Sequence, residues 1–166
     1  MIQLLQVFLL AMTPIGELRA AIPVGLGIFH LNWFLVFIVS VVGNLAPVVF
    51  LLLFLEPISK FLSQNFKIFN RFFFWLFERT KKRIPLGNKK YTLPALALFV
   101  AVPLPMTGAW TGAILAYLLG IPFKKSFLAI GAGVLGAGII VILAAKAGIA
   151  INKYFGLSTL LAVIFV

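Results

Sequence analysis

Long apolar segments dominate this chain, and two of them are interrupted near their middle by proline and polar residues. The first interruption runs from Thr13 to Arg19 and the second from Pro103 to Trp110. Lipid cannot hydrogen-bond a freed backbone group, so a broken helix at membrane depth needs protein or a water-filled cavity around it. Paired interruptions in two halves of a chain are typical of transporters built from inverted repeats, whose binding site lies between the halves.

The apolar segment before the first interruption predicts one half of a re-entrant hairpin. Residues 1–12 make a helix of about 18 Å at 1.5 Å per residue, which crosses about half of a ~30 Å hydrocarbon core. Thr13 and Pro14 predict the start of a second short helix, because the hydroxyl can cap free N–H groups and proline suits the first helical position. We expect this second helix to extend to about residue 29.

A spanning helix is predicted over residues 33–55, an apolar run of sufficient length that begins at an interfacial tryptophan. Within it, Asn44 lies about 18 Å deeper than Asn32, close to the predicted hairpin tips. Its amide is expected either to hydrogen-bond a neighbouring helix or to contact a substrate. The next residues, 58–77, place phenylalanines and basic residues on opposite sides, which predicts an amphipathic helix in the headgroup region.

Lysine pairs on both sides of residues 93–121, at 89–90 and 124–125, decide how that segment enters the membrane. If the segment crossed once, one pair would lie outside. The positive-inside tendency instead favours a second re-entrant hairpin, with its tip near Pro103 to Thr107. Residues 127–149 then cross outward, and Lys146 near the far end of that helix is expected to extend to the interface.

These elements predict an all-α integral membrane protein with two inverted repeats, each a re-entrant helical hairpin plus a transmembrane helix. A single membrane domain covers residues 1–166. The first repeat is 1–55, the amphipathic helix and a basic cytoplasmic loop are 56–92, and the second repeat is 93–166. Whether residues 155–166 cross the membrane is left open, because they are too short to cross upright.

Small residues recur every four positions in both halves, and Gly43 and Gly133 occupy matching places 90 residues apart. Such spacing predicts close-packing seams between helices. The same seams could serve a contact in a homo-oligomer, so the oligomeric state stays open. The seam residues are Gly16 and Ala20 in the first half and, in the second half, Gly108, Gly112, Ala116, Gly120, Ala129, Gly133 and Ala137.

The composition agrees with a membrane protein: 63% of residues are hydrophobic, 10% are charged, and the mean hydropathy is +1.19. The net charge of +11 is concentrated between the predicted repeats, which indicates a cytoplasmic loop facing anionic lipid headgroups and not a nucleic-acid site. This basic stretch contains Lys60, Lys67, Arg71, Arg79, Lys81, Lys82, Arg83, Lys89 and Lys90.

The residues exclude most catalytic and metal chemistry. There is no cysteine and only one histidine, His30, and the three acidic residues are scattered along the chain. No metal site, no cofactor site and no nucleophile with its base can be assembled from these residues, so we expect no enzyme.

Glu17 and Arg19 are the ionisable residues of the first interruption, where a charge costs at least about 2.5–3.5 kcal/mol on insertion scales. At a spacing of two they point to different sides of a regular helix, so we expect each to find its own partner, water or ligand. One hypothesis is that both brace the hairpin tip. The other makes Arg19 an anion ligand and Glu17 a carboxylate that couples transport to a proton or cation.

Helix starts near Thr13-Pro14 and Thr107 would both aim free N–H groups at mid-membrane, which favours a phosphate or carboxylate there. Thr107 is alternatively only a cap. Trp110 is expected either to pack or to stack on a substrate.

The residues of both interruptions resemble the small multidrug export family, which is similar in architecture to the DedA superfamily. The resemblance rests on Pro14, Glu17 and Arg19, on the run Pro103 to Gly112 that includes Pro105, and on the basic middle loop. It implies opposed re-entrant hairpins in the cytoplasmic membrane of a bacterium or archaeon. It also implies the movement of phospholipids or polyprenyl phosphates, with proton coupling suggested.

From these observations we expect a small membrane transporter for a lipid-linked or amphipathic anion, with membrane lipids as partners and proton coupling left open. The second hairpin carries no acidic residue, so coupling that needs a carboxylate in each repeat is in doubt. The alternatives are a small multidrug or cation exporter and a membrane scaffold without transport. The candidate substrate or coupling residues are Thr13, Pro14, Glu17, Arg19, Asn44, Pro103, Pro105, Thr107 and Trp110.

Overall fold

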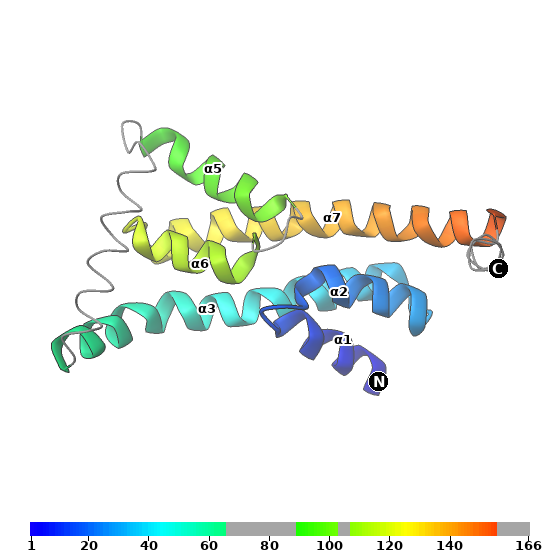
Figure 1. Ribbon diagram of the computed structural model, residues 1–166, viewed down its shortest axis with the longest axis horizontal. Coiled ribbons are helices and arrows are strands. Elements are labelled where there is room, and N and C mark those ends of the chain that lie inside the picture. Colours follow the sequence, from blue (N-terminus) through cyan, green and yellow to red (C-terminus); the bar gives the residue numbers. More distant parts are fainter. Residues whose placement is uncertain (66–88, 103–106, 156–166) are drawn as a thin grey trace, which may run out of the picture. The chain divides into compact units, whose positions relative to one another are not determined.

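The computed structural model describes residues 1–65, 89–102 and 107–155, and every regular element in these ranges is helical (Figure 1). Pro103 and Pro105, the basic loop up to residue 88, and residues 156–166 lie outside the described residues, as does most of the predicted amphipathic helix. The elements are α1 (Ile2–Met12), α2 (Glu17–Pro23), the π-helix η1 (Val24–Ile28), α3 (Trp33–Asn65), α5 (Lys89–Ala101), α6 (Ala109–Leu118) and α7 (Phe123–Phe155).

The chain forms two compact units, and both long helices contribute to each of them. One unit combines Met1–Gly43 with Gly138–Val166, and the other is Asn44–Ala137. The boundaries therefore fall inside α3 and α7. Each unit contains a pair of short helices together with portions of the two long ones.

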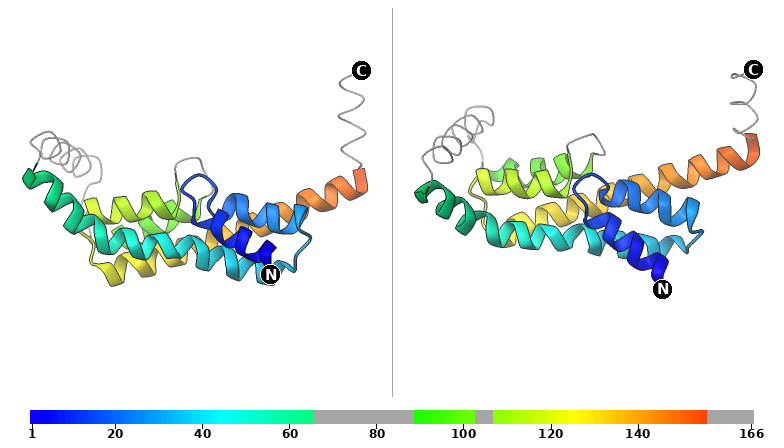
Figure 2. Two further views of the ribbon diagram at one scale, coloured as in Figure 1. Left: turned by 90° about the horizontal axis from the view of Figure 1, so that it is seen from below. Right: turned by 60° about the horizontal axis from the view of Figure 1, so that its bottom comes forward.

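In the first unit, α1 and α2 pack as a hairpin (Figure 2). Small residues allow it to approach α3 closely. A Cβ atom at Gly43 would lie 2.7 Å from the carbonyl oxygen of Phe8, and one at Gly25 would lie 2.8 Å from a methyl group of Val36. Only glycine fits at these contacts, because real Cβ atoms do not approach other heavy atoms this closely. The hairpin's buried apolar residues are Val7, Ala11, Leu18, Ala21 and Ile22.

The π-helix η1 follows directly from Pro23, the last residue of α2. Proline has no N–H for the carbonyl four residues earlier, and its ring crowds that carbonyl, so one α-helical hydrogen bond is lost and the helix is disturbed at this point. The chain instead forms a wider turn in which the Phe29 N–H donates to the Val24 carbonyl at 3.1 Å.

In the second unit, α5 and α6 lie side by side (Figure 2). The close packing predicted at Gly112 and Gly133 is confirmed, whereas the prediction for Gly120 is wrong, because a Cβ there would meet nothing within 4 Å. A Cβ at Gly112 would lie 2.6 Å from a methyl group of Val100, and one at Gly133 of α7 would lie 2.6 Å from the Ala97 carbonyl oxygen. Gly120 has another role, because it ends α6 with φ +63° and donates to the Tyr117 carbonyl.

The two long helices bury the same positions when they are compared at a separation of 90 residues. Buried residues of α3 are Val36, Ser40, Gly43 and Asn44, and those of α7 are Ser126, Ile130, Gly133 and Val134. The shared pattern extends the short sequence match around Gly43 and Gly133 over more than two helical turns.

The predicted bounds of three helices are wrong. The helix expected over residues 33–55 continues as α3 to Asn65, through the start of the predicted amphipathic helix, and Pro57 lies inside it. α5 begins at Lys89, which was placed in the basic loop, and α7 begins at Phe123 and ends at Phe155. In each case the helix extends past the polar residues taken as its boundary, because lysine and glutamate are good helix formers whatever the surrounding polarity.

Trp33–Ile58 and Phe123–Ile149 are long and apolar enough to cross a membrane. Large apolar side chains also cover the exposed face of α7, among them Leu128, Ile139 and Leu143. A surface of this kind suits lipid better than water.

Candidate functional site

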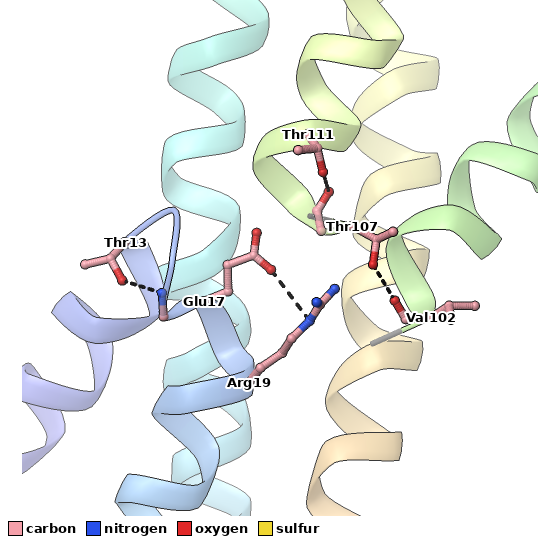
Figure 3. A network of polar contacts seen from close by, with 8 residues as sticks. Thr13, Glu17, Arg19, Val102, Thr107 and Thr111 are labelled. Carbon is pink, nitrogen blue, oxygen red and sulfur yellow. Dashed lines mark hydrogen bonds and ion pairs between the residues drawn. The ribbon is translucent and has the colours of Figure 1, made fainter. Parts of the chain in front are cut away.

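The turn between α1 and α2 is held by Thr13. Its hydroxyl donates to the Leu10 carbonyl at 2.8 Å, and its Oγ1 accepts from the Gly16 N–H at 3.0 Å (Figure 3). Thr13 is thus the C-cap of α1, and Pro14 lies exposed in the turn. The prediction that α2 starts at Thr13-Pro14 is wrong: α2 begins at Glu17, because the left-handed φ of Glu17 does not allow a regular helix to run through from Pro14.

Glu17 has an unusual backbone conformation at the start of α2. Its φ is +47°, in the left-handed region that residues other than glycine and asparagine rarely adopt. The residue is also buried, with 7% of its surface exposed. A buried carboxyl group on a strained backbone persists only where its surroundings hold it, and such positions cluster at functional sites.

Glu17 and Arg19 face one another, contrary to the prediction that each would find a separate partner. The Arg19 Nε and Glu17 Oε2 atoms are 3.9 Å apart (Figure 3). The prediction assumed regular helical spacing, whereas the left-handed φ of Glu17 redirects its side chain. The separation exceeds hydrogen-bond length, so this pair attracts without the bidentate contact that arginine can make with a carboxylate.

The two charged groups differ in accessibility. The Arg19 side chain keeps 23% of its surface exposed and the Glu17 side chain 9%. A ligand would therefore reach the guanidinium more readily than the carboxylate.

The described residues of the second interruption, between α5 and α6, carry no charge. The Thr107 hydroxyl donates to the Val102 carbonyl at 2.8 Å, and the Thr111 hydroxyl donates to the Gly108 carbonyl at 3.2 Å (Figure 3). Thr107 thus ties the start of α6 to the last residues of α5 and provides no side-chain cap for α6. Trp110 is half-buried on the first turn of α6.

Asn44 is 1% exposed on α3, and among the described residues its Oδ1 atom has no hydrogen-bond partner. Ser40, one turn earlier, is fully buried, and its hydroxyl likewise has no partner in these ranges. The sequence pattern pointed to Asn44 and not to Ser40, although the spacing of four residues places both on one side of a helix.

Lys146 lies with its Nζ 4.2 Å from the centre of the Trp33 ring, within the first unit. This cation–π contact joins α7 to the first residue of α3. The sequence does not predict this contact, because nothing in the spacing of two residues more than a hundred positions apart indicates one.

One family model matches residues 17–140, more than half of the chain, and its description is "Putative small multi-drug export protein". The chain belongs to the small multidrug export family. The part of the chain that the family model matches begins at Glu17 and includes Arg19, Asn44, Thr107 and Trp110. Thr13 and Pro14 precede it. No match was found among curated proteins or among solved structures.

Membership of the small multidrug export family agrees with the two membrane-capable helices, and we treat the chain as a membrane protein of that family. Within the described ranges, no group of three His, Cys, Asp or Glu side chains could hold a metal ion. The candidate polar groups that the structure describes are the Glu17–Arg19 pair and the buried oxygens of α3.

Proposed function

We propose that this protein is a multi-pass transporter of the cytoplasmic membrane that exports amphipathic anions, with Arg19 as the anion ligand. The observation that carries the proposal is the loosely paired, largely buried Glu17–Arg19 couple in the turn that interrupts an apolar segment. Ionisable residues inside membrane segments mark substrate or ion pathways, because their insertion is otherwise unfavourable.

The short helices support re-entrant hairpins in this proposal. α1 has 11 residues and α6 has 10, lengths of about 15–17 Å that cross roughly half of a bilayer core. The buried positions shared by α3 and α7 at a separation of 90 residues support two repeats. We infer their inverted orientation from the positive-inside argument. The architectural similarity to the DedA superfamily is inferred from the resemblance of the residues in the two interruptions and the basic loop.

Arg19 favours an anionic headgroup. Its guanidinium is the more exposed member of the pair, and its planar fork fits phosphate with two parallel hydrogen bonds. Apolar residues beside the turn, among them Ile15, suit the hydrocarbon portion of an amphipathic substrate. A phospholipid or a polyprenyl phosphate has both parts. Glu17, displaced from Arg19 by the phosphate, is the group that we propose to carry a proton.

The test is transport by the full chain in proteoliposomes. A fluorescent phospholipid with an anionic head and a fluorescent organic cation are supplied separately, each with and without a pH gradient. We expect the anionic lipid to move faster than in empty vesicles. This movement should be lost in Arg19→Ala. It should be reduced in Arg19→Lys, which keeps the positive charge but lacks the planar guanidinium. Glu17→Gln should retain lipid binding and lose the response to the pH gradient.

Lys124→Ala is the matched control, because it also removes one positive charge but at an exposed position on the first turn of α7. Equal losses in Lys124→Ala and Arg19→Ala would mean that surface charge, and not the site, controls the flux. Transport of the organic cation that depends on Glu17 and survives Arg19→Ala would replace the anion exporter by a cation exporter.

A further inference from the structure

One face of α3 carries polar and helix-breaking residues within an otherwise apolar helix. Ser40 lies three and four residues before Gly43 and Asn44, and Pro47 lies four and three residues after them, so the four residues lie on the same side of the helix. All four are buried. The face is therefore not exposed to water or lipid headgroups that could satisfy its polar atoms.

Two oxygen atoms on this face have no hydrogen-bond partner in the part of the chain that the structure describes. They are the Ser40 Oγ and the Asn44 Oδ1, on residues that are 0% and 1% exposed. Leaving one such group buried and unpaired costs about 1–3 kcal/mol, and native proteins contain few of them. Two within a single helical turn need an explanation other than chance.

Pro47 frees a third oxygen on the same face. It lies inside α3 and has no N–H, so the helical hydrogen bond that would end on the Gly43 carbonyl cannot form. Carbonyl oxygens released in this way supply cation ligands in membrane proteins with interrupted helices. Ser40, Gly43 and Asn44 together thus offer a hydroxyl, a carbonyl and an amide oxygen within five residues.

The second long helix, α7, shows that close packing at this position does not require the polar residues and the proline of α3. Ninety positions later, the buried residues are Ile130, Val134 and Ala137, where α3 has Ser40, Asn44 and Pro47. The glycine between them is kept, and Gly133 contacts a backbone carbonyl as Gly43 does. The oxygens of α3 are therefore additions to a packing arrangement that works without them.

We propose that this face of α3 binds a small monovalent cation, with Na⁺ as the ion to test. Three neutral oxygens attract a hard cation, and the absence of a carboxylate among the four residues favours a single charge over a double one. The proposal does not depend on the transport activity proposed above, because ion binding stabilises the folded state whether or not the protein transports anything.

The experiment measures thermal unfolding of the purified full chain in detergent, with NaCl or KCl replacing choline chloride at constant ionic strength. We expect the apparent Tm to rise and saturate with the alkali ion and to stay constant with choline. Asn44→Val introduces the residue found at position 134 and should raise the half-saturating ion concentration about tenfold or more. Pro47→Ala should weaken the ion response too, because it restores the N–H that engages the Gly43 carbonyl.

Ser126→Ala is the matched control. It also removes a fully buried serine hydroxyl, but one that already donates to the Ile121 carbonyl at 3.1 Å, so the ion response should be that of the unchanged protein. Equal Tm values in sodium, potassium and choline would overturn the proposal, as would an unchanged ion response in both Asn44→Val and Pro47→Ala. Should Asn44→Val fail to fold, Ser40→Ala provides the same comparison.

Discussion

Replacing Gly133 by alanine tests whether α5 and α7 pack through direct contact of a glycine with a backbone carbonyl. A Cβ at this position would lie 2.6 Å from the Ala97 oxygen and 2.7 Å from the Val100 Cβ. Neither atom is the flexible end of a side chain, so the two helices would have to separate. Inserting a methyl group into a packed contact of this kind costs about 1–3 kcal/mol.

Gly131 is the matched position, because it lies on the same helix and a Cβ there would meet nothing within 4 Å. Both substitutions gain the same helix propensity, about 0.8–1.0 kcal/mol. The difference between the two variants therefore isolates the packing contact. At about 2–4 °C per kcal/mol for a chain of this size, Gly133→Ala should unfold about 2–12 °C below Gly131→Ala.

The measurement is the loss of helical circular dichroism on heating both variants in one detergent at one micelle concentration. Gly131→Ala should match or exceed the unchanged protein. If Gly133→Ala unfolds at or above the temperature of Gly131→Ala, the close approach of α5 to α7 is wrong.

Three further substitutions test single contacts. Thr107→Val removes the hydroxyl that donates to the Val102 carbonyl and should lower stability by about 0.5–1.5 kcal/mol in the same thermal assay, whereas Thr107→Ser should retain it. Lys146→Met removes the ammonium group over the Trp33 ring and should cost about 0.5–1 kcal/mol, and Lys146→Arg, which keeps a cation there, should unfold close to the unchanged protein. Glu17→Gly should be about 1–2 kcal/mol more stable than Glu17→Ala, because both variants lack the carboxylate and only glycine adopts φ +47° without strain. Equal unfolding temperatures of the two variants would contradict the left-handed conformation.

Local pattern was sufficient to predict the helices and the seams between them. The apolar runs predict α1, α3 and α7, because the length of an apolar run can be counted directly in the sequence. Recurring small residues predict the close contacts at Gly112 and Gly133 for the same reason. The ends of the helices were predicted less well, since a lysine or glutamate at a boundary continues a helix as readily as it ends one.

The sequence by itself determined that the chain is helical and apolar, and that Glu17, Arg19 and Asn44 are its unusual polar residues. Only the tertiary structure decided what they contact. The left-handed φ at Glu17 brings its carboxylate toward Arg19, which regular spacing forbids, and burial leaves the oxygens of Ser40 and Asn44 without partners. Backbone strain and hydrogen-bond satisfaction depend on the whole surroundings of a residue, and spacing along the chain reports only its nearest neighbours.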